Sequence, residues 1–260
     1  MAVEQAGALL GDTALDPDTY LRLLSVSAEQ LLAQDARGGQ PLSVAASWAV
    51  AFDRLAADDP TALDLLTVVA WCGPEPVPRR LLSDHPDQLP DRLCRAAADP
   101  LRLGRYTRML RRRGLATVTP HGLQLHRVPA LLLRDRTRTS PQEWGATVVR
   151  LLRVALPANV WNESAAWPPW QALLSHVLAA VAPDRALQDV PDEVAWLLEI
   201  AGVYRHTRGD ARGAFPLLQR AYALRRDRLL AAADGDDDGA IHGDDVNRAF
   251  RAAFVGVVAL

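Results

Sequence analysis

Apolar residues recur every three or four positions through much of the chain, the spacing that places side chains on one face of an α-helix. Turn-forming residues interrupt the pattern, among them Gly38-Gly39 and a proline-rich connector at residues 73–78. Helices are predicted at residues 17–32, 43–57, 79–83, 102–113, 128–138, 141–156 and 170–181, after Pro60, and as a pair within 190–231 broken at Gly209-Asp210. The pattern predicts a mostly helical protein.

The spacing changes from helical to alternating between residues 114 and 126. Gly114 is expected to end the preceding helix, because glycine adopts positive φ without a steric penalty. Residues 115–118 and 123–126 then alternate on either side of a turn at residues 119–122, which is typical of a β-hairpin. Helices followed by a hairpin and a further helix are typical of a winged helix. We expect an all-α fold with one small β-hairpin wing.

Charge is distributed unevenly along the chain. Residues 92–138 carry twelve Arg against Asp99 and Asp135, a charge of +10 within a chain of net charge −2. On the helix predicted at 102–113, an apolar stripe contains Leu103 and Leu110, and the opposite side carries Arg102, Arg105, Arg108, Arg111 and Arg112. The arginines indicate either a face that contacts DNA phosphates or a solvated helix face whose arginine stems cover apolar neighbours, with contact to an acidic protein partner included in the second interpretation.

Several classes of function lack their motifs. All 29 basic residues are Arg, so the lysine of a Walker A phosphate loop is missing, and Cys72 and Cys94 match no paired-cysteine metal or redox spacing. We expect two buried thiols in a reduced cytoplasm, no membrane span, no cofactor and no enzymatic activity. The scattered His85, His121, His176 and His206 are predicted to be surface or capping residues, and Trp48, Trp144 and Trp170 to pack in the core.

An acidic stretch at residues 234–245 contains six Asp. Asp234, Asp236, Asp238, Gly239 and Asp245 match positions 1, 3, 5, 6 and 12 of an EF-hand loop, which binds calcium through oxygen ligands. Position 12 is Asp rather than the longer Glu, and a single loop lies where a linker would fall. An acidic insertion without metal is therefore the favoured interpretation.

Three stretches resemble one family of signalling proteins. Residues 1–7 (MAVEQAG) resemble the helix after the Gly-Leu-Pro-Leu-Ala motif of NB-ARC ATPases. Residues 47–55 (SWAVAFDRL) and Leu125-His126-Arg127 resemble the winged helix of bacterial NB-ARC proteins, and residues 198–223 resemble a tetratricopeptide repeat. The chain looks like the C-terminal half of an actinobacterial NB-ARC (STAND) tetratricopeptide repeat protein that lacks the ATPase domain.

The resemblance implies a role for His126, and the chain departs from the family there. In the family a Met-His-Asp-type motif places its histidine near the nucleotide phosphates; His126 matches that position, but Arg127 replaces the Asp. Because the phosphate loop is missing too, we expect a vestigial sensor and a structural role for His126 at the strand–helix junction.

The repeat-like pair at 190–231 supplies the candidate protein-binding residues. Gly202 is expected to let the two helices approach closely, Gly209 to form the turn, and Ala214 and Ala221 to pack on the first helix. One repeat cannot bury its own face, so residues 246–260 are interpreted as the first helix of a second repeat, with an apolar face that favours self-association.

The expected organisation has four parts: an N-terminal helical segment (1–40), a winged-helix domain (41–140), connecting helices (141–187) and a truncated tetratricopeptide-like region (188–260). The resemblance implies a non-catalytic regulatory or scaffolding protein that binds a protein partner. The alternative is a transcriptional regulator that binds DNA through the arginine-rich helix 102–113.

Overall fold

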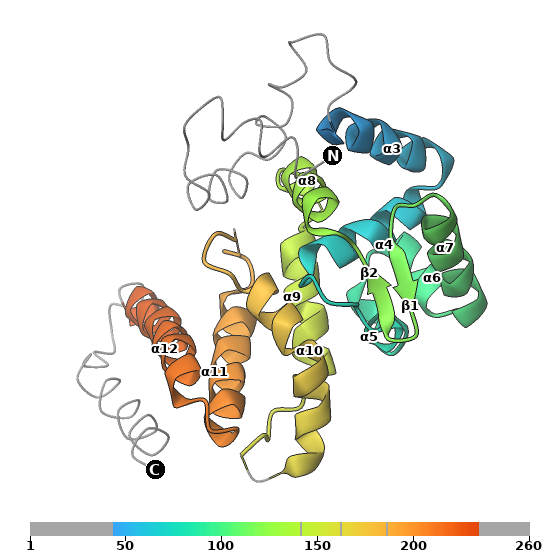
Figure 1. The fold of residues 1–260 in the computed structure, drawn as a ribbon. Helices are drawn as coiled ribbons and strands as arrows, with labels where there is room; N and C mark the ends of the chain where they lie inside the picture. Colours follow the sequence, from blue (N-terminus) through green and yellow to red (C-terminus); the bar gives the residue numbers. More distant parts are fainter. Residues whose placement is uncertain (1–43, 141, 162, 186, 234–260) are drawn as a thin grey trace, which may run out of the picture. The chain divides into compact units, whose positions relative to one another are not determined.

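A computed structural model describes residues 44–140, 142–161, 163–185 and 187–233 (Figure 1). The chain divides into two compact units between Val148 and Val149, and each unit is described by itself. The described residues are mostly helical with one two-stranded antiparallel sheet, which confirms the predicted helical fold with a small hairpin.

Side-chain caps and prolines set where the helices of the first unit begin. The Asp59 carboxylate accepts a hydrogen bond from the Ala62 amide at 3.3 Å, and Asp99 accepts from Leu101 at 2.9 Å. A proline follows each cap in the first helical turn, where its missing N–H costs nothing. The helices are α3 (Val44–Asp58), α4 (Pro60–Trp71), α5 (Arg79–Ser83), α6 (Asp91–Ala97), α7 (Pro100–Arg112) and α8 (Arg127–Thr137), with a 3₁₀ turn at Pro86–Gln88.

The core of this unit surrounds α4, which packs against α3, α6, α7 and α8 (Figure 1). Leu65 and Leu66 of α4 are fully buried, as are Leu55 of α3 and Leu110 of α7. Because neighbours cover α4 on several sides, it is buried almost all round rather than along one stripe.

The sheet pairs β1 (Thr117–Thr119) with β2 (Gly122–Gln124), with Val118 opposite Leu123. On its other edge β2 meets Val77, whose backbone N–H and C=O bond Leu123 at 2.8 and 3.0 Å. A Cβ on Gly122 would overlap the Val77 carbonyl, so this approach requires glycine. The proline-rich connector therefore adds a one-residue bridge to the sheet, which the sequence did not predict.

The second unit contains the end of α9 (Trp144–Ala155), then α10 (Trp167–Ala180), α11 (Pro191–Thr207) and α12 (Ala211–Ala233), with a 3₁₀ turn at Ser164–Ala166. Trp170 is its largest fully buried side chain. Its indole stacks 6.0 Å from the Tyr204 ring and donates a 2.9 Å hydrogen bond to the Pro157 carbonyl. Along the residues that the structure describes, no helix is long and apolar enough for a bilayer crossing.

Candidate interaction surfaces

The helix α7 separates charge from core as predicted. Leu103, Thr107 and Leu110 are buried on one side. Arg102, Arg105, Arg108, Arg111 and Arg112 are all exposed to solvent, so together they form a basic face along three turns of helix.

Local contacts hold part of this basic face in place. Arg102 lies 3.3 Å from the carboxylate of Asp99, the Arg105 guanidinium lies 5.7 Å from the Tyr106 ring centroid, and the Arg108 Nε donates to the Gly104 carbonyl at 3.2 Å. Arg111 and Arg112 have no comparable partner among the described residues. The C-terminal turn of α7, which contains Arg111 and Arg112, is therefore the part of the basic face best placed to attract an anionic partner.

His126 occupies the N-cap position of α8, with φ −64° and ψ 153°. Its backbone carbonyl accepts the first helical hydrogen bond, from Ala130 at 3.0 Å, and its imidazole makes no capping bond. The residue supports the junction through its backbone, and its exposed side chain is left for other contacts.

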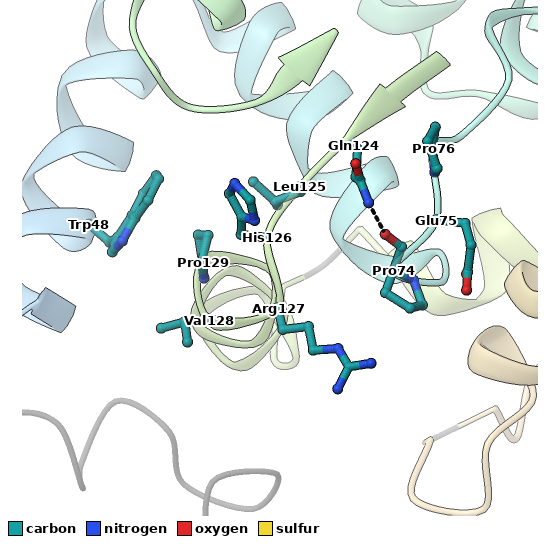
Figure 2. Close-up of a pocket in the computed structure, with 10 residues that line it drawn as sticks. All are labelled: Trp48, Pro74, Glu75, Pro76, Gln124, Leu125, His126, Arg127, Val128 and Pro129. Carbon is teal, nitrogen blue, oxygen red and sulfur yellow. Dashed lines mark hydrogen bonds between the residues drawn. The ribbon is translucent and has the colours of Figure 1, made fainter. Parts of the chain in front are cut away.

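An open pocket of about 710 Å³ lies at this junction (Figure 2). Figure 2 shows the His126 imidazole between Trp48 and Gln124, with the Arg127 side chain directed away from it. Gln124 links β2 to the proline-rich connector in the pocket wall, because its Nε2 donates a 2.7 Å hydrogen bond to the Pro74 carbonyl. The lining residues are Trp48, Pro74, Glu75, Pro76, Gln124, Leu125, His126, Arg127, Val128 and Pro129.

The candidate residues of the repeat-like pair come together between α11 and α12. A Cβ on Gly202 would lie 2.6 Å from Leu218 Cγ, and Ala214 and Ala221 are buried. Gly209 has φ +83°, and Asp210 caps α12 by accepting from the Gly213 amide at 2.8 Å. Ion pairs Arg225–Glu199 and Arg228–Asp192 join the two helices. Gly202, Ala214 and Ala221 therefore shape the hairpin from inside, and the outward faces are what a partner would contact.

His176 was predicted to lie on the surface or at a cap, and this prediction is wrong. It is fully buried in α10. The signal was present in the sequence, because Leu173, His176, Val177 and Ala180 follow the spacing of a buried helical stripe.

Two further residues, Cys94 and Trp48, are less buried than predicted. The other cysteine, Cys72, is buried as predicted. Its burial raises the pKa of the thiol to about 12, and the nearby Arg134 opposes this shift. Cys94 is only half-buried, because the short helix α6 covers the core with Leu93, Ala96 and Ala97 alone. Trp144 and Trp170 are buried as predicted, but Trp48 is half-buried and lines the pocket.

Two exposed apolar side chains of α12 were not predicted from the sequence. Phe215 is 50% exposed and Leu230 is 47% exposed. Their positions lie off the spacing of Ala214, Leu218 and Ala221, which is the signal that separates them from the buried face.

Several predicted features lie outside the described residues: the NB-ARC-like stretch 1–7, the acidic stretch 234–245 and the apolar segment 246–260. Within the described ranges, no three His, Cys, Asp or Glu side chains gather closely enough to hold a metal ion. Comparison of the chain with known protein families, with curated proteins and with solved structures finds no match.

Proposed function

We propose that this protein is a non-catalytic regulatory or scaffolding protein of the NB-ARC (STAND) type that acts by binding another protein. The observation that carries the proposal is the α11–α12 hairpin. Its inner face is filled by small residues and closed by ion pairs, so it is a firm two-helix unit. α11 also packs against α10, so the exposed side chains of α12 are the part of the hairpin that a partner would contact. A tetratricopeptide-like repeat would have this construction.

The order of elements in the first unit supports a winged-helix domain. In order, the chain forms α4, the Val77 bridge, α5, α6, α7, β1 and β2. The Val77 bridge lies beside β2 rather than β1. In this interpretation α7 is the helix before the wing, and its basic face is a second place for a partner to bind.

The scaffolding proposal is tested by wedging the hairpin apart. We expect Ala214→Leu to abolish capture of the protein partner by tagged full-length chain, because the buried Ala214 has no room for a larger side chain. Ala211→Leu makes the same change at an exposed position of the same helix and should leave capture unchanged. Quantitative mass spectrometry of captured proteins measures both, with circular dichroism as a check on folding. Equal capture by both variants would contradict the proposal.

DNA binding is the second candidate, favoured by the five exposed arginines of α7. If α7 contacts phosphates, Arg105→Ala with Arg108→Ala should weaken binding in fluorescence anisotropy and lower the slope of log K against log salt by about two. Arg79→Ala with Arg80→Ala, on exposed residues of α5, is the matched control. For a scaffold we expect only weak, sequence-independent binding of short duplexes. Sequence-specific binding tighter than roughly 100 nM at physiological salt would favour the DNA-binding function instead.

A further inference from the structure

The outermost positions of α7 combine one apolar side chain with three arginines. Leu101 is 82% exposed, the highest value for a large apolar side chain among the described residues. Arg105, Arg108 and Arg112 follow it at intervals of four, three and four positions, and all three are exposed. At this spacing the four side chains lie along one side of the helix, opposite its buried side. We call these four residues the outer stripe of α7.

The charge of the outer stripe is not neutralised within the part of the chain that the structure describes. Its three arginines form no ion pair with a carboxylate among those residues. Arg108 lies three positions from Arg105 and four from Arg112, and like charges at these intervals repel each other on a helix surface. A negatively charged partner relieves this repulsion, so charge complementarity selects an anionic occupant.

We propose that the outer stripe of α7 binds an acidic amphipathic helix of the protein partner, with carboxylates against the three arginines and an aliphatic side chain against Leu101. The interval of four, three and four positions belongs to one face of a helix, so a second helix can match it over about 16 Å. A guanidinium group donates two parallel hydrogen bonds to a carboxylate, which makes such pairs strong. The inference rests on the proposed function, which supplies the class of partner.

The N-terminal end of the stripe favours a protein partner over nucleic acid. When a helix reads DNA in the major groove, its N-terminal residues contact the base edges. In α7 these positions include Pro100, Leu101 and Gly104, whose side chains offer no hydrogen-bonding group. Arg102 is paired there with Asp99 at 3.3 Å, and the Asp99 carboxylate repels phosphates. An aliphatic side chain of a partner helix instead removes Leu101 from water.

The helix dipoles set the direction of the partner helix. Arg111 and Arg112 lie in the last turn of α7, where a positive charge interacts favourably with the dipole. Carboxylates are favoured at the opposite end of a helix, in its first turn. Matching the two charged ends places the partner helix antiparallel to α7. Its acidic N-terminal turn then lies beside Arg112, and its aliphatic residue lies beside Leu101.

Fluorescence anisotropy with a labelled peptide tests the proposal in the full chain. The probe is an alanine-based helix whose three glutamates and one following leucine repeat the spacing of the stripe. We expect Arg105→Ala with Arg108→Ala to weaken binding about tenfold, because two charge-assisted pairs are lost. Arg79→Ala with Arg80→Ala, at exposed positions of α5, should leave binding unchanged. No binding by the unmodified chain at about millimolar peptide would overturn the proposal, as would equal binding of a peptide with glutamine in place of glutamate.

Leu101→Ser separates a protein partner from nucleic acid. We expect this change to weaken peptide binding about threefold and to leave the weak binding of a short DNA duplex unchanged. A duplex that binds more tightly than the peptide, with no effect of Leu101→Ser on the peptide, would assign the stripe to nucleic acid and overturn the proposal. Capture of the partner is tested separately at Ala214, so a chain that keeps capture but does not bind the peptide contradicts this inference alone.

An exchange of charges tests the antiparallel direction. We expect Arg112→Glu to abolish binding of the probe, and a probe with arginine in place of its first glutamate to restore it, because the antiparallel arrangement places that side chain opposite position 112. A probe with arginine in place of its last glutamate should not restore binding. Restoration by this second probe alone would overturn the antiparallel docking.

Discussion

Asp64 lies within the core of the first unit, 7% exposed on α4, with the Arg92 Nε 3.4 Å from its carboxylate. Burial raises the pKa of Asp64 above 3.8, and Arg92 opposes this only in part. The folded state then binds more protons than the unfolded state in the pH range just above 3.8. This residue's contribution to stability therefore falls as pH rises through that range.

Replacing the carboxylate by an amide of the same shape removes this pH dependence. We expect Asp64→Asn to raise the free energy of unfolding at pH 7, and the gain to shrink as the pH is lowered towards 4, because the raised pKa lets Asp64 take up its proton in the folded state at a higher pH than in the unfolded state. Urea unfolding at the two pH values measures the difference, with the exposed Asp87→Asn as the control. A loss of stability at pH 7 would mean that the pairing with Arg92 outweighs desolvation.

The conformation of single residues was predicted well where neighbouring residues in the sequence determine it. The exposure of single side chains was predicted poorly where distant helices determine it. Gly114 ends α7 with φ +67°, and the turn at Gly209 forms as expected, because both depend on a few neighbouring residues. His176 and Cys94 were misplaced, because their exposure depends on which distant helices cover them. Helical spacing applied to polar as well as apolar residues would have predicted that His176 is buried.

The pairing of α11 with α12 depends on the missing side chain of Gly202. A methyl group there would lie 2.6 Å from Leu218 Cγ and 2.8 Å from its Cδ2, and Leu218 is itself buried. We expect Gly202→Ala to destabilise the chain by about 1–2 kcal/mol, because the cost of overpacking exceeds the gain in helix propensity.

Gly104 of α7 provides the matched control, since a Cβ there would meet nothing within 4 Å. Gly104→Ala should stabilise by about 0.5–1 kcal/mol through helix propensity alone. Chemical denaturation of the two variants separates packing from propensity. Similar effects of the same sign would contradict the close approach seen at Gly202.

At the level of elements, the periodic helices were predicted and the irregular pieces were not. The bounds of α3, α5 and α8 lie within one or two residues of expectation, because α3 and α8 carry a clear apolar stripe and α5 directly follows the proline-rich connector. The seven-residue α6 was missed, since Leu93 and two small alanines are too few to form a recognisable period. The Val77 bridge was missed because it pairs with a residue far along the chain, which no local pattern contains.

For the molecule as a whole, we expect no hydrolysis of ATP and no binding of ADP tighter than about millimolar, because the sequence contains no phosphate loop and no lysine. Isothermal titration calorimetry with ADP and magnesium measures this directly. Micromolar affinity would contradict the expectation. If His126→Ala removed that affinity, the pocket beside Trp48 would become the nucleotide site.

The surfaces of the molecule were predicted in part. The basic face of α7 follows from helical spacing alone, so all five arginines were placed correctly on the exposed side. The pocket at His126 combines α3, the proline connector and the β2–α8 junction, and sequence spacing contains no information on how such distant segments meet. The exposed Phe215 and Leu230 of α12 were missed because the small residues of its buried face were the more conspicuous pattern.

The Val77–Gly122 contact bears on how this gene tolerates random mutation. Every missense change in a glycine codon adds at least a Cβ, and at Gly122 that atom would overlap a carbonyl fixed by backbone bonds of 2.8 and 3.0 Å. At Gly104 the same atom would meet empty space. Two codons eighteen positions apart thus differ sharply in the substitutions they accept, and variants at Gly122 would be purged from a mutant library while those at Gly104 persist.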